Sequence, residues 1–192
     1  MTRICRGVLA IGAVLALAGC GLPASGHVER VDPSSVPFGL LATAPSGSPT
    51  PQARGPSTLV YFVRGDRLGT APRRVFGANV PAEAVRLLLT GPEPAEAAHG
   101  LTTDIPSGTR LISLDLTGPV AKVDLSAEFG TVGGSEQVLA VAQIVYTLTA
   151  SRYIDAVSFA ISGKPIEVPD GSGSLSRTPR NRQDYRNLAP AG

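Results

Sequence analysis

The sequence has few of the residue types that build catalytic and stacking sites. It contains no tryptophan, two histidines and two cysteines in 192 residues. Few aromatic side chains argue against a stacking platform for sugars or single-stranded nucleic acid. His27 lies in a proline-rich stretch, so His99 is the one histidine of the part expected to fold, which excludes a histidine-rich zinc site. The chain also has no G-x-S-x-G elbow, no S-x-x-K pair and no P-loop.

The chain also has no excess of basic over acidic side chains once the N-terminal segment is left out. The chain has 17 Lys+Arg against 15 Asp+Glu, and Arg3 and Arg6 lie in a segment expected to be removed, so the remaining side chains balance. Nucleic-acid binding usually needs a concentrated basic patch, and no nucleic-acid partner is expected here. The one basic cluster lies near the C-terminus, where a solvated end is favoured over a surface for anionic lipid; it comprises Arg177, Arg180, Arg182 and Arg186.

The first residues have the order of a secretory signal. Two arginines precede an uncharged apolar stretch, Gly7 to Ala18, and a small-residue cleavage site follows. The stretch has about twelve residues, whereas a membrane-spanning helix needs about twenty. Residues 1–19 are therefore expected to be a signal peptide that is cut off on export.

Leu17-Ala18-Gly19-Cys20 resembles the lipobox of bacterial lipoproteins. The resemblance implies that Cys20 carries S-linked diacylglycerol and an amide-linked acyl chain such as palmitate, which would anchor the protein at the extracytoplasmic face of the cell membrane. Cys5 belongs to the removed segment, so the mature chain keeps one cysteine and forms no intramolecular disulfide. The alternative is an ordinary signal cut after Ala16-Leu17-Ala18, with Cys20 incidental.

Composition divides the mature chain into three parts. Residues 20–57 hold seven prolines among Gly, Ser and Ala, which predicts a tether after the lipidated Cys20. Within it, Val36–Leu41 is an apolar stretch that either docks on the domain or makes only nonspecific contacts from the linker. The folded domain is expected over 58–170, and a flexible tail over 171–192.

Apolar periodicity predicts an α+β domain, a small sheet with two helices packed on one face. The helices are expected over 81–89 and 136–151, and the second carries Gln143 and Thr147 on one face, where they could bond a sheet edge or a cap. The expected strands are 58–63, 73–76, 154–161, 166–168 and a hairpin of 109–117 with 120–125.

No catalytic, cofactor-binding or metal-binding residue is predicted. Asp115 and Asp124 fall on adjacent strands of the expected hairpin, but solvent-facing acids are more common than a glycosidase pair, and Asp124 suits a turn cap. Asp104 and Glu128 are read in the same way, as surface acids. His99 is favoured as a surface histidine over a general base. The run Asp170–Gly173 has too few acids for a calcium loop and reads as a flexible turn.

Residues 81–185 resemble the GerMN domain of sporulation and germination proteins. The similarity is carried by Leu87–Pro92, Gly100–Thr109, Val123–Ser126, Leu139–Thr149, Val157–Gly163 and Asp184-Tyr185. The start of the mature chain is similar to actinobacterial GerMN lipoproteins and to the front of the LpqB lipoprotein family, and an Arg-rich, Lys-poor composition agrees with a GC-rich genome. The resemblance implies a fold like the ring-building motif of envelope assemblies and no catalytic residues.

Together these features predict a lipid-anchored, non-enzymatic module that binds protein partners in the cell envelope. A lipoprotein that binds cell-wall glycan or a small ligand is the alternative. A hydrolase that uses Asp115 or Asp124 ranks last.

Overall fold

The structure, a computed structural model, describes residues 55–191. The expected signal peptide, Cys20, most of the expected tether and Val36–Leu41 lie outside the described residues. Between residues 55 and 191, no helix combines the length and the apolar character that a bilayer-spanning segment requires.

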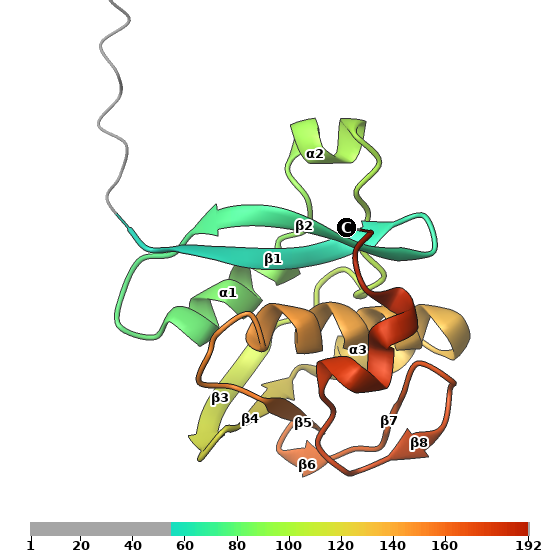
Figure 1. The fold of residues 1–192 in the computed structure, drawn as a ribbon. Coiled ribbons are helices and arrows are strands. Elements are labelled where there is room, and N and C mark those ends of the chain that lie inside the picture. Colours follow the sequence, from blue (N-terminus) through green and yellow to red (C-terminus); the bar gives the residue numbers. More distant parts are fainter. Residues whose placement is uncertain (1–54, 192) are drawn as a thin grey trace, which may run out of the picture. The chain divides into compact units, whose positions relative to one another are not determined.

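Two helices form the middle layer of the domain (Figure 1). Helix α1 spans Val80–Leu89, and the side chain of its N-cap residue, Asn79, accepts a hydrogen bond from the Ala82 N–H at 3.1 Å. Helix α3 spans Gly134–Leu148. Both agree with the predicted helices, and a third short helix, α2 (Pro94–Ala98), falls in a region expected to be a loop.

A four-stranded sheet covers one side of the helices. Strands β3 and β4 form the predicted antiparallel hairpin, β4 and β5 are parallel with α3 as the connection, and β6 pairs antiparallel with β5. A β-bulge lies between Leu111 and Ser113. The order is β3 (Leu111–Thr117), β4 (Val120–Leu125), β5 (Ala156–Ile161) and β6 (Lys164–Pro165).

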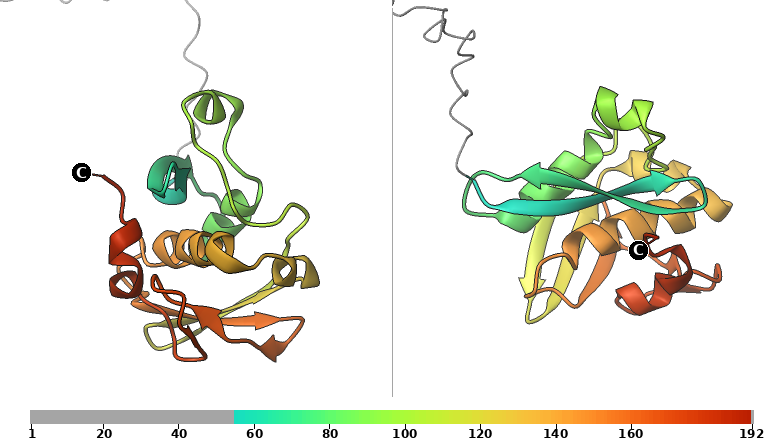
Figure 2. Two further views of the ribbon diagram at one scale, coloured as in Figure 1. Left: turned by 90° about the vertical axis from the view of Figure 1, so that its right-hand side faces the viewer. Right: turned by 45° about the horizontal axis from the view of Figure 1, so that its top comes forward.

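A separate hairpin covers the other side of the helices (Figure 2). Its strands are β1 (Ser57–Arg64) and β2 (Arg67–Arg74), so the strand expected over 73–76 begins and ends earlier. The prediction of an α+β fold with two helices on one face of a small sheet is confirmed. The sequence did not predict that the first two strands leave this sheet and cover the helices from outside.

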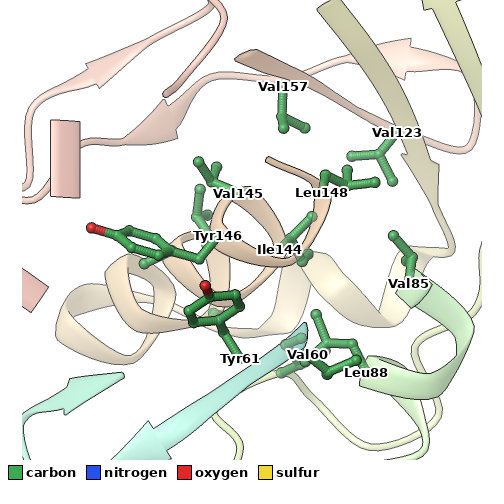
Figure 3. Packing of buried hydrophobic residues seen from close by; sticks show 14 of the residues in the cluster. Val60, Tyr61, Val85, Leu88, Val123, Ile144, Val145, Tyr146, Leu148 and Val157 are labelled. Carbon is green, nitrogen blue, oxygen red and sulfur yellow. The ribbon is translucent and has the colours of Figure 1, made fainter. Parts of the chain in front are cut away.

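The core follows from this sandwich, because α3 is covered on both sides (Figure 3). Every residue of α3 from Ala140 to Leu148 is buried. One side of the helix meets Val60 of β1, and the other meets Val123 and Val157 of the sheet. This two-sided burial explains why the apolar stripe of α3 is broader than that of a surface helix.

The flexible tail expected over 171–192 is wrong for the described residues. In residues 171–191, β8 (Leu175–Ser176) pairs with β7 (Val168–Pro169), and a 3₁₀ helix follows over Arg182–Leu188. Tyr185 is fully buried, and its hydroxyl donates to the Pro169 carbonyl at 2.5 Å. The buried Tyr185 side chain thus helps to hold this segment on the domain, although the composition of the segment is typical of a loop.

Two of the four arginines of this tail are also held in place, whereas Arg177 and Arg186 are exposed. Arg180 is 7% exposed and donates to the carbonyls of Val168 and Ser174 at 2.7 and 2.8 Å. The guanidinium of Arg182 lies 5.2 Å from the ring centre of Tyr61 and 4.8 Å from that of Tyr146. These two cations therefore hold the tail in place and do not form a solvated basic patch.

Candidate functional site

The polar residues of α3 are used inside the fold. The Thr147 hydroxyl accepts the Tyr61 N–H at 3.1 Å, and the Gln143 amide donates to the Tyr61 carbonyl at 3.2 Å. Gln143 is fully buried and Thr147 nearly so. The expectation that these two side chains bond a strand edge is confirmed, and the edge is that of β1.

The segment Gly100–Thr109 is fastened to the same place. The Asp104 N–H donates to the Gln143 side-chain oxygen at 3.0 Å. Thr102 and Val63 exchange two backbone hydrogen bonds of 2.8 Å. The outer edge of β1 is therefore bonded by the side chains of Gln143 and Thr147 and by the backbone of Thr102. These groups take the place of a neighbouring strand.

The candidate acids are not gathered into a catalytic pair. Asp124 is 6% exposed, and both of its carboxylate oxygens accept the Gly163 N–H, at 3.0 and 2.9 Å. Asp124 therefore caps the β5–β6 turn. Asp115 is exposed, lies opposite Lys122 and accepts a hydrogen bond from Ser113 at 3.2 Å.

The other candidate residues, His99, Glu128 and Asp104, are not part of a catalytic arrangement among the described residues either. His99 is exposed at the end of α2, with its Nδ1 2.6 Å from the Ala95 carbonyl. Glu128 faces Arg110 at 3.7 Å. Burial, and secondarily the charge of Glu136, raise the pKa of Asp104. Over residues 55–191 no three His, Cys, Asp or Glu side chains come together in a way that could hold a metal ion.

One charged pair was not predicted from the sequence. Arg73 of β2 is 8% exposed, and its two terminal nitrogens donate to the two carboxylate oxygens of Glu96 in α2. The hydrogen bonds raise the pKa of Arg73 and lower that of Glu96. The guanidinium also lies 5.6 Å from the Phe62 ring centre. The pair holds α2 on the β1–β2 hairpin. Its two residues are 23 positions apart in the sequence, so no local pattern predicts it.

An apolar groove of about 650 Å³ lies at the beginning of α3. Its volume falls within the usual range of ligand pockets. No aromatic ring and no basic side chain line it, so it suits apolar side chains better than sugars or phosphates. Its walls come from α3, the β1–β2 turn, the β7–β8 segment and the 3₁₀ helix Arg182–Leu188. Its apolar lining is Val138, Leu139, Pro169, Leu175 and Leu188.

Known proteins share this fold. A family model described as "Germane: Sporulation and spore germination" matches residues 59–167. No curated protein matches the sequence. The tandem GerMN domains of the sporulation protein GerM from Bacillus subtilis match with a TM-score of 0.54 and 20% identity, over 67% of this chain and 47% of that chain. This protein thus spans about half the length of the tandem structure.

Two further solved structures were found. The first GerMN domain of the same Bacillus subtilis protein matches with a TM-score of 0.54 and 20% identity, over 67% of this chain and 98% of that chain. A candidate lipoprotein from Clostridium perfringens has a TM-score of 0.48 and 18% identity, over 69% of this chain and 91% of that chain. The family model covers more than half of the sequence, and the chain belongs to the Germane, or GerMN-domain, family of sporulation and spore germination proteins.

Proposed function

We propose that the protein is a lipid-anchored, extracytoplasmic module that binds a protein partner in the cell envelope and catalyses no reaction. One observation carries this proposal. The polar residues of the family signature, Gln143 and Thr147 above all, bond the domain's own backbone. The groove at the beginning of α3 offers another molecule a mainly apolar wall, with polar side chains of Asp66, Ser135, Gln137 and Ser172 also in its lining.

The anchor is supported by the sequence. Leu17-Ala18-Gly19-Cys20 has the lipobox pattern, and Cys20 is the one cysteine left after the signal is cut. Diacylglycerol together with an amide-linked chain binds membranes firmly, whereas a single acyl chain binds marginally. The intact mass of the mature protein tests this part, and an unmodified Cys20 would contradict it.

The groove is the proposed partner site, and site-specific photocrosslinking tests it. A photoreactive side chain at Ser172, which lines the groove, is expected to give one discrete protein adduct in membranes. Leu175→Glu should abolish that adduct, because Leu175 is 59% exposed in the groove wall and its replacement leaves the core intact. The same photoreactive group at Tyr153, which is 66% exposed and outside the groove, is the matched control.

Equal adducts from Ser172 and Tyr153, or an adduct that survives Leu175→Glu, would overturn the partner site. The size of the groove also favours a second candidate, a small apolar ligand. A thermal-shift screen separates the two, since a ligand that binds the folded state raises its melting temperature. Wall fragments belong in the same screen, although a groove without aromatic rings is poorly suited to sugar rings.

A further inference from the structure

Most strand edges of the domain are closed. The outer edge of β1 is bonded by Thr147, Gln143 and Thr102. The outer edge of β5 is bonded by β6 and by Arg180, which exchanges two backbone hydrogen bonds of 2.8 Å with Val157. Strand β2 carries Pro72, and β6 is two residues long and ends in a proline. Proline and short length are usual protections of an edge.

Strand β3 is the exception among residues 55–191. It is the terminal strand of the four-stranded sheet, is seven residues long and contains neither proline nor lysine. The carbonyl of Leu125 bonds toward β5, so alternation along β4 turns Lys122 and Asp124 toward β3. Their partners on β3 are Asp115 and Ser113.

The backbone of β3 therefore presents the N–H and C=O groups of Leu114 and Leu116 outward. Two large apolar side chains accompany them, because Ile112 is 54% exposed and Leu116 is 52% exposed. The bulge between Leu111 and Ser113 bends one end of the strand and leaves the pairing from Ser113 to Thr117 regular. A long, unpaired edge with exposed apolar side chains is a template for another strand.

We propose that β3 pairs antiparallel with β3 of a second copy of this chain, about a two-fold axis at Leu114. This register places Ile112 opposite Leu116 of the second copy, so the two exposed apolar side chains cover each other. It also places Ser113 opposite Asp115 of the second copy, a hydroxyl facing a carboxylate. The outward groups of Leu114 then bond those of Leu114 of the second copy.

Neighbouring registers are less favourable. An axis at Asp115 would set two carboxylates directly opposite each other, which destabilises a strand pair. An axis at Ser113 would set Leu116 against Arg110. A closed two-fold contact uses the same surface on both copies and cannot extend into a fibre. The pairing does not depend on the proposed partner site, since no β3 residue lines the groove.

Disulfide formation between two different variants tests this register. In the proposed pair, Ser113 and Asp115 of the second copy are about 4.5–5.5 Å apart at Cα, which suits a disulfide. Full chains carrying Ser113→Cys and Asp115→Cys are produced together in the same membranes and oxidised. A linked dimer is expected only from the mixture. At most about half of all dimers can be linked, because random pairing of two variants puts one of each in about half of the dimers.

Each variant produced singly is expected to give no linked dimer, since its two cysteines would lie more than about 7 Å apart. The parent chain, with Cys5 and Cys20 only, is oxidised as the background. Leu116→Lys in both chains should lower the yield at least about fivefold, because a charge on the edge opposes pairing. Tyr153→Lys, a change at another exposed apolar position outside β3, should leave the yield unchanged.

Three results would overturn the proposal. They are a mixture that links no more than the parent chain, single variants that link as well as the mixture, and a yield that Leu116→Lys does not lower. Circular dichroism of each variant checks folding; Asp115, Leu116 and Tyr153 are solvent-exposed, and Ser113 is half-buried. A β3 edge that instead binds another envelope protein would give the first of these results.

Discussion

Replacement of Gln143 by methionine tests whether α3 holds the β1–β2 hairpin through side-chain hydrogen bonds. Methionine has a similar length and no amide, so the core stays filled while two backbone groups lose their partner. These are the Tyr61 carbonyl, bonded at 3.2 Å, and the Asp104 N–H, bonded at 3.0 Å. A buried polar group without a partner costs about 1–3 kcal/mol.

The Asp104 N–H is only partly buried and water reaches it more easily than the Tyr61 carbonyl. We therefore expect Gln143→Met to lower the free energy of unfolding by about 2–4 kcal/mol. Thr147→Val keeps the side-chain shape and frees the Tyr61 N–H, so a loss of about 1–3 kcal/mol is expected. The double variant should lose less than the sum, because both changes release the same strand.

Urea unfolding followed by circular dichroism measures these losses. Gln183→Met is the matched control, since Gln183 is exposed and a change of at most about 0.5 kcal/mol is expected there. If Gln143→Met and Thr147→Val both fell within the range of this control, the hydrogen bonds would not hold the hairpin, and the reading of the signature residues as folding residues would be wrong.

Three further predictions concern the tail, the acid at Asp104 and the anchor. Tyr185→Ala should lower the free energy of unfolding by about 3–5 kcal/mol in urea unfolding, as for a buried aromatic, whereas a free tail would show no loss. Because the pKa of Asp104 is raised, its charge destabilises the fold above that pKa, and the penalty vanishes below about pH 3.9, the unfolded value. Asp104→Asn should therefore raise stability at pH 7 and not at pH 3; an equal gain at both would refute the cause. Cys20→Ser should leave the signal uncut or release an unlipidated form, with the domain still folded, as intact mass and circular dichroism would report.

Local patterns predicted the helices and the central hairpin well. The apolar spacing of α1 and α3, and the Gly118-Pro119 turn between β3 and β4, are local signals that need no tertiary information. A turn cap was also foreseen for Asp124, but the acid was expected to face solvent, whereas it is buried and caps a turn at Gly163, 39 residues away.

What the sequence could not predict depends on contacts between distant residues. Strand β1 has the composition of a strand, but whether it joins the main sheet depends on Gln143 and Thr147, more than 80 residues away. Tyr185 lies in a segment of breakers and charges, and a composition average hides one buried ring. The groove combines four segments that are distant in sequence, so no single stretch predicts it.

The placement of β1 has a mechanical consequence. Any pull on the chain before Ser57 enters the domain along this strand, and the strand is bonded on one side by β2 and on the other by Thr147, Gln143 and Thr102. A force directed along β1 loads these bonds together in shear, so they resist as a group and do not open one at a time. Under such a pull, the hairpin would therefore transmit the load to α3 through these bonds.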